Sequence, residues 1–167
     1  MIVRVETDAD TAVISELVTD VFRNGAEARL IERLRDEGHI AVSLVAAVHG
    51  RIAGSVVFSH LPICAEDRTI AAAALAPLAV HPDYQRLGIG AALVNEGMRI
   101  CKLRGKDAVI VLGDPQYYAR FGFSCDLAAG IESAYSGSSF MALELIPGAL
   151  RLPRGAAKYP APFDEVS

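Results

Sequence analysis

The residues with the clearest chemical potential are Gln85-Arg86-Leu87-Gly88-Ile89-Gly90, which precede a segment with apolar residues at helical spacing. The two glycines therefore fall at the start of a predicted helix, where backbone N–H groups lack partners and the helix dipole adds partial positive charge. Glycines at such a place let a phosphate reach these donors, and Arg86 adds a formal positive charge. The chemistry predicted from this stretch is pyrophosphate binding.

Two widespread phosphate-binding motifs do not match this stretch. The P-loop requires G-x-x-x-x-G-K-[ST], and the chain contains no Gly-Lys-Ser or Gly-Lys-Thr. The dinucleotide fingerprint requires G-x-G-x-x-G, and Leu93 stands in the place of its third glycine. A nucleotide-binding domain is therefore disfavoured. On the glycines alone, an ordinary turn explains the stretch as well as a phosphate site does.

The flanking segments predict a strand–helix–strand unit. Residues 69–80 form a strand that ends at Pro82, the helix runs from Ile89 to Gly105, and a second apolar strand covers residues 107–112. A unit of this length predicts two parallel strands with a right-handed crossover. Pro77 interrupts the first strand and cannot donate a hydrogen bond to the sheet, so the strand is expected to bulge or splay there.

Two motifs resemble the GNAT superfamily of N-acetyltransferases. Gln85-x-x-Gly88-x-Gly90 is similar to the family's acyl-CoA-binding signature Q/R-x-x-G-x-G/A, and residues 118–123 (YARFGF) are similar to its Y-x-x-x-G-F. They occur in the family's order, and the resemblance covers roughly residues 40–125. It implies an α/β (α+β) GNAT fold. In that fold a mixed, mostly antiparallel central sheet has helices on both faces and a V-shaped splay between two parallel strands.

The resemblance also implies acetyl-CoA as co-substrate and names the residues that would bind it. These are Leu78, Ala79, Val80, Gln85, Arg86, Leu87, Gly88, Ile89, Gly90, Ala91 and Tyr118. Leu78 and Val80 would bind through backbone groups, and the donors of residues 86–91 would hold the pyrophosphate. Tyr118 matches the family's tyrosine and is the candidate general acid for the departing thiolate. Tyr117 is the alternate, and packing is the structural alternative for Tyr118.

The function implied is transfer of an acetyl group to a primary amine of a small molecule or protein, by direct attack in a ternary complex. The general base is not identified. Many family members carry a glutamate on the long strand, but residues 71–76 read AAAALA, and the family's asparagine is also absent. Glu27, His60 and Asp83 remain as candidates, with Glu27 as base or acceptor contact because its region borders the acceptor site in this family. A chain of waters, an acceptor of low pKa, and a non-catalytic acyl-CoA-binding or sensing module are the alternatives.

Composition limits the other classes of function. One GNAT domain is expected over residues 1–167, with 52% hydrophobic residues and a net charge of −4. The charge and the lack of a basic stripe disfavour nucleic acid, and no apolar run approaches the ~20 residues that cross a membrane. The acids in MIVRVETDAD do not fit a signal peptide, so a cytoplasmic location is expected.

The three cysteines are too few and too scattered for disulfides or a zinc site, so no metal is expected. None is placed to carry an acyl group, which disfavours a ping-pong route. The sequence leaves a homodimer open. It also leaves the acceptor open among antibiotics, polyamines, amino acids and protein termini.

The remaining pattern predicts the other elements. Strands are expected at residues 2–5, 40–48, 52–61 and 139–146, with the third ended by Pro62. Helices are expected after Thr7 and over residues 27–36, and a short helix is expected to begin at Pro115 with Asp114 as its cap. The inner face of the first helix is predicted as Ala12, Val13, Leu17, Val18, Val21 and Phe22. The last twenty residues are expected to wrap the surface.

Overall fold

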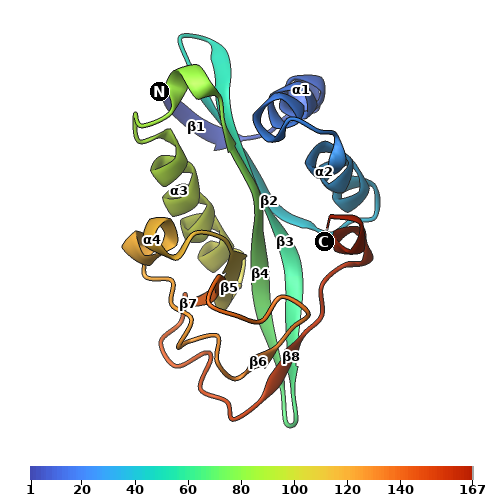
Figure 1. Cartoon of the computed structure of the whole chain (residues 1–167), viewed down its shortest axis with the longest axis vertical. Helices are drawn as coiled ribbons and strands as arrows, with labels where there is room; N and C mark the ends of the chain where they lie inside the picture. The colour runs from blue at the N-terminus through green and yellow to red at the C-terminus, as the bar shows by residue number, and fades with distance from the viewer. Residues whose placement is uncertain (167) are drawn as a thin grey trace.

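The structure is a computed structural model that describes residues 1–166. An 8-stranded sheet has the order β1-β2-β3-β4-β5-β7, and β8 pairs with β3 and β6 (Figure 1). The strands are β1 Ile2–Val5, β2 Ile40–Val48, β3 Arg51–Ala65, β4 Thr69–Val80, β5 Ala108–Leu112, β6 Ile131–Glu132, β7 Phe140–Glu144 and β8 Gly155–Ala157. The helices are α1 Thr11–Phe22, α2 Ala26–Asp36, α3 Ile89–Leu103 and α4 Pro115–Tyr118, with 3-10 turns η1 Asp8–Asp10, η2 Pro82–Tyr84, η3 Ala119–Phe121 and η4 Ala161–Glu165.

The predicted strand–helix–strand unit is β4, α3 and β5, and its strands are parallel. Residues 72–75 of β4 pair with residues 108–111 of β5, while residues 76–80 of β4 continue beyond that ladder. On its other edge β4 pairs with β3, with a register shift between Val56 and Phe58 that lies opposite Pro77. The strand was expected to bulge or splay at Pro77, and it does both; the predicted fold class is confirmed.

Helices cover both faces of the sheet (Figure 1). The helices α1 and α2 enclose one apolar core, and α3 encloses the other. Gly97 lets α3 lie close to β3, because a Cβ at this position would sit 2.1 Å from Cε2 of the Phe58 ring.

Two predictions about local structure were wrong. In α1 the prediction was right for Leu17 and Val18, which are buried, and for Val21 and Phe22, which pack against the core. It was wrong in the first turn, where Ile14 is buried, Val13 is 43% exposed and Ala12 is also exposed. Pro62 does not end β3, which continues to Ala65.

The reason β3 continues lies in the direction of the Pro62 backbone. Its carbonyl accepts the Lys158 N–H at 2.9 Å, so this residue's polar groups point toward the C-terminal segment. The missing N–H therefore leaves the ladder with β4 intact. The C-terminal segment is itself more than a surface wrap, because β8 joins the sheet and the buried Phe163 of η4 packs into the core beside α2.

Candidate active site

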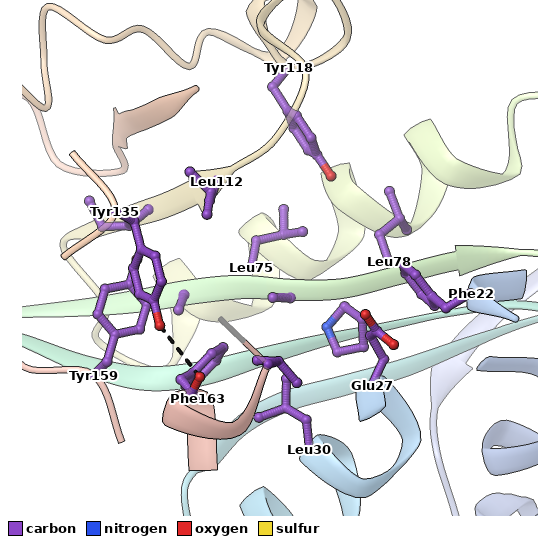
Figure 2. Close-up of a pocket in the computed structure, with 15 residues that line it drawn as sticks. Phe22, Glu27, Leu30, Leu75, Leu78, Leu112, Tyr118, Tyr135, Tyr159 and Phe163 are labelled. Atoms are coloured by element: carbon purple, nitrogen blue, oxygen red, sulfur yellow. Dashed lines mark hydrogen bonds between the residues drawn. The ribbon is translucent and has the colours of Figure 1, made fainter. Parts of the chain in front are cut away.

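A cavity of about 330 Å³ opens where β4 leaves β5; we call it the splay cavity (Figure 2). Its walls come from α1 and α2 on one face of the sheet, from α4 on the other, and from the C-terminal segment. It therefore reaches through the gap between the two strands. The lining residues are Phe22, Glu27, Leu30, Ala74, Leu75, Ala76, Pro77, Leu78, Ile110, Leu112, Tyr118, Tyr135, Tyr159, Phe163 and Val166.

A second cavity of about 490 Å³ lies at the start of α3; we call it the loop cavity. It shares Phe22 and Leu78 with the splay cavity, so the two adjoin. Its lining residues are Val21, Phe22, Leu78, Val80, Tyr84, Gln85, Arg86, Gly88, Ile89, Gly90, Ala91, Tyr117 and Arg120.

The start of α3 offers backbone donors to the loop cavity. Gly88 is the N-cap residue with φ +83°, a left-handed conformation that favours glycine. The first helical bond runs from the Ala92 N–H to the Gly88 carbonyl at 3.0 Å, and among residues 1–166 no side chain caps this end. The N–H groups of residues 89–91 therefore remain for a ligand. Gly90 keeps the approach open, because a Cβ there would lie 2.6 Å from the Tyr117 hydroxyl.

The two cavities carry opposite charge. Arg86 and Arg120 line the loop cavity, and no carboxylate does so within the described part of the chain. The Arg120 guanidinium also stacks 4.5 Å above the centroid of the Tyr117 ring. In the splay cavity Glu27 is the one charged side chain among the described lining residues. The loop cavity is thus suited to an anion and the splay cavity to a cation.

The free end of β4 presents its edge to the cavities. The His81 N–H donates to the Ala53 carbonyl of β3 at 2.8 Å, and backbone groups alternate in direction along a strand. Val80 and Leu78 therefore direct their polar groups away from β3. The Val80 carbonyl already accepts Gln85 Nε2 at 3.0 Å, a bond that ties the loop to the strand end.

Eight of the ten predicted strand and loop residues line the loop cavity. The other two do not: Ala79 is 1% exposed in the core, and Leu87 is 66% exposed and points to neither cavity. Tyr117 and Arg120, which also line this cavity, were not predicted as cofactor contacts. The sequence feature that could have indicated them is their position, since Arg120 lies within the second motif and Tyr117 directly precedes it.

Tyr118 stands at the end of α4, and its hydroxyl points into the splay cavity (Figure 2). The ring packs edge-on against Phe123 at 5.8 Å and Tyr117 at 5.0 Å. Gly113 makes room for it, since a Cβ there would lie 2.6 Å from Tyr118 Cε2. Burial, together with the neighbouring Tyr117, raises the pKa of Tyr118 to about 12, so the hydroxyl keeps its proton at neutral pH. The adjacent tyrosines thus serve different cavities.

Glu27 lies in the first turn of α2 and directs its carboxylate into the splay cavity from the face opposite Tyr118 (Figure 2). Its Oε2 atom is buried and has no hydrogen-bond partner in the described chain. Of the other two candidate bases, His60 is an exposed residue of β3 and Asp83 is 84% exposed, and neither lines a cavity. The structure therefore brings Glu27 alone of the three to the splay.

Three aromatic residues at the far end of the splay cavity were missed from the sequence; we call them the aromatic wall, Tyr135, Tyr159 and Phe163 (Figure 2). Ring centroids lie 5.0 Å apart for Tyr135 and Tyr159 and 5.2 Å apart for Tyr159 and Phe163, all edge to face. The Tyr135 hydroxyl donates to the Phe163 carbonyl at 3.4 Å. The sequence feature that could have indicated them is the occurrence of aromatic residues in segments that lack helical or strand periodicity.

Other kinds of site are not indicated in the described residues. No cluster of three or more His, Cys, Asp or Glu side chains suited to a metal ion occurs in residues 1–166. In the same range, no helix has the length and apolar character needed to span a bilayer.

A parallel pair that splays beside an uncapped helix start with two glycines is the arrangement that the resemblance to acetyltransferases implied. Residues 11–123 match the sequence profile of the acetyltransferase (GNAT) family. The chain belongs to this family and is an acyltransferase, as its two motifs predicted.

Relatives extend the similarity over the full length. The uncharacterized N-acetyltransferase YhbS of Escherichia coli is 34% identical over 167 residues, which is 98% of this chain and 99% of that protein. The crystal structure of Escherichia coli YhbS in complex with CoA superposes with a TM-score of 0.90 at 32% identity, covering 99% of this chain and 93% of that one. The crystal structure of a GNAT family acetyltransferase from Brucella melitensis in complex with acetyl-CoA superposes with a TM-score of 0.80 at 31% identity. The match covers 98% of this chain and 97% of that one. One relative of this chain thus holds CoA and the other holds acetyl-CoA, the predicted co-substrate.

Proposed function

We propose that this protein transfers an acetyl group from acetyl-CoA to a primary amine, by direct attack of the amine in a ternary complex. The observation that carries the proposal is the pair of adjoining cavities with opposite charge. The loop cavity offers backbone donors and two arginines to a pyrophosphate, and the splay cavity offers a carboxylate to an amine. The CoA and acetyl-CoA complexes of two relatives support the choice of donor.

The donor fits the residues that are present. The N–H groups of residues 89–91 and Arg86 would hold the pyrophosphate, and the edge of β4 at Leu78 would lead the pantetheine toward Tyr118. The Val80 carbonyl keeps one lone pair beyond its bond with Gln85, so it can still accept a hydrogen bond. The thioester supplies the activated acetyl group. The protein supplies its position and the groups that handle protons.

The acidity of Tyr118 decides how it helps the leaving thiolate. A thiol has an ordinary pKa of about 8.5. A hydroxyl with a pKa of about 12 is a weaker acid, and full proton transfer from it would cost about 5 kcal/mol. We infer that Tyr118 stabilises the departing sulfur mainly by donating a hydrogen bond. The same hydroxyl then relays a proton lost by the amine to the sulfur.

Direct attack is favoured because no cysteine lines either cavity in residues 1–166. Cys64 and Cys125 are exposed elsewhere, and Cys101 is buried in the core. Burial raises the pKa of the Cys101 thiol to about 12, so it is not a thiolate at neutral pH. An acyl-cysteine intermediate therefore has no residue to form on.

The test is a thiol-release assay with acetyl-CoA and a panel of amines, on the parent protein and two matched variants. Tyr118→Phe and Tyr117→Phe remove the same hydroxyl from the two different cavities. We expect kcat to fall about 10²-fold in Tyr118→Phe with acetyl-CoA affinity retained. We expect Tyr117→Phe to keep kcat within a few fold. A folded protein that binds acetyl-CoA but releases no thiol with any amine would overturn the proposal in favour of an acyl-CoA sensor.

A further inference from the structure

We propose that the acceptor is a small primary amine with one positive charge, no carboxylate, and an aromatic or branched apolar body. Glu27 would hold its ammonium group, and the aromatic wall would hold its body. The inference rests on the proposed function and specifies the substrate class of the same site.

The charge of the splay cavity sets the charge of the acceptor. A primary amine arrives as an ammonium ion at neutral pH. Glu27 is the one charged side chain among the described lining residues, and its Oε2 is buried without a partner. A buried acceptor atom without a donor is costly, and an ammonium group of the ligand supplies that donor. One carboxylate matches one ammonium group.

The same set of lining residues disfavours other classes of amine. No Lys or Arg lines the splay cavity in the described chain, so the carboxylate of an amino acid would lie near Glu27 without a counter-ion. The second ammonium group of a diamine would find no second carboxylate among the lining residues that the structure describes. The volume of about 330 Å³ is at the small end of ligand sites, which disfavours a large polycyclic antibiotic.

The aromatic wall sets the shape of the acceptor's body. The Tyr159 ring contacts the rings of Tyr135 and Phe163 edge to face, and the hydrogen bond from the Tyr135 hydroxyl to the Phe163 carbonyl joins the two ends of this wall. Leu30, Ile110 and Leu112 add further apolar lining to this cavity. Aromatic and aliphatic surfaces gain most from contact with an apolar body. The pocket therefore pairs a cationic end with an apolar end.

The proton balance is complete without another reactant. The ammonium group gives one proton to the Glu27 carboxylate, and the neutral amine attacks the thioester carbonyl carbon. The new N–C bond forms as the C–S bond breaks and its electron pair goes to sulfur. The attacking nitrogen loses its second proton to the thiolate through Tyr118, and Glu27 releases the first to water. The products are an amide, CoA with a free thiol, and one proton.

The experiment measures kcat/KM in the thiol-release assay with matched amines. Phenethylamine and phenylalanine differ by a carboxylate, phenethylamine and ethylamine by a ring, and pentylamine and 1,5-diaminopentane by a second charge. We expect the first member of each pair to be preferred at least 10-fold. A preference for phenylalanine, for the diamine or for a lysine peptide, with turnover that still depends on Tyr118, would overturn this inference and leave the proposed function standing. Failure of every amine would overturn both.

Two variants test the assigned contacts. Glu27→Gln keeps the side-chain size and removes the charge, so we expect kcat/KM for phenethylamine to fall at least 100-fold while the Kd of acetyl-CoA stays within 2-fold. Glu27→Asp should recover part of the loss. Tyr159→Leu should raise KM for phenethylamine at least 5-fold and leave KM for ethylamine unchanged. Parent-like kinetics in Glu27→Gln, or an equal effect of Tyr159→Leu on both amines, would contradict the assignment.

Discussion

Replacing Gly90 with alanine should separate the stability of α3 from its ability to bind CoA. Gly90 is the second residue of α3, where alanine improves helix propensity by up to ~1 kcal/mol. Its added Cβ would lie 2.6 Å from the Tyr117 hydroxyl, which must move, and it would cover donors at the helix start. Losing one hydrogen bond to a charged phosphate costs ~1.5–3 kcal/mol, or roughly 10- to 150-fold in Kd.

The assay combines calorimetry with CoA and thermal unfolding of the free protein. Gly90→Ala should unfold at or above the parent temperature and bind CoA at least 10-fold more weakly. The double variant Gly90→Ala/Tyr117→Phe removes the clashing oxygen, so any affinity it recovers measures the displacement of Tyr117, and the remainder measures crowding of the donors. Pantetheine, which lacks phosphates, is the control ligand. If Gly90→Ala bound CoA as tightly as the parent, the assignment of pyrophosphate to this helix start would be wrong.

Three further substitutions test the fold and the loop. Gly97→Ala should lower the free energy of unfolding, measured in urea, by ~1–2 kcal/mol, because overpacking against Phe58 outweighs the higher helix propensity of alanine. Adding Phe58→Leu to this variant should relieve the loss. An unchanged urea midpoint in Gly97→Ala would contradict this prediction. Asp10→Asn should lower the stability of the folded protein at pH 7, because hydrogen bonds from Arg4 and the Thr7 N–H hold the pKa of the Asp10 carboxyl well below its usual range. The difference should shrink as pH falls below about 4, because the unfolded parent chain then binds a proton at Asp10 that the folded parent does not, so an equal loss at pH 7 and pH 3 would count against the pair. Arg86→Ala should weaken CoA binding by ~1–2 kcal/mol, which is a rise of roughly 5- to 30-fold in the Kd measured by calorimetry, with a smaller loss at high salt. An unchanged Kd would show that this residue does not contact the phosphates.

The parts predicted from sequence are those that local patterns encode. The strand and helix around Gly88 have unambiguous apolar periods, and β4 spans residues 69–80 as predicted. The missing N–H of Pro77 predicted that β4 would bulge or splay, because the defect acts on its own strand. Pro62 has the same defect, but its carbonyl faces the C-terminal segment, a contact more than ninety residues away in sequence that no local pattern reveals.

The acceptor side of the site was less predictable for the same reason. Glu27 could be placed only by family resemblance, because its position in the splay depends on how α2 packs against the sheet. The aromatic wall depends on the C-terminal segment folding back across the end of the cavity, far from the motif residues (Figure 2). Val13 was wrongly predicted to be buried because the apolar residues of α1 extend beyond the stripe that packs on the sheet.

The absence of a carboxylate on β4 has a physical explanation in this arrangement. Ala74 and Ala76 line the splay cavity, and their small side chains leave the space that the proposed acceptor would occupy. A glutamate in that place would fill the space, whereas Glu27 supplies its charge from α2 across the gap.

The separation of charges follows from the residues that the two cavities share. Phe22 and Leu78 line both cavities, and both are apolar. They stand between the arginines of the loop cavity and the carboxylate of the splay cavity, which in direct contact would form an ion pair. With this apolar boundary the cations remain available to a phosphate and Glu27 to an ammonium group. In the proposed reaction, acetyl-CoA would span the boundary and bring its thioester carbon to the place where Tyr118 and Glu27 face each other (Figure 2).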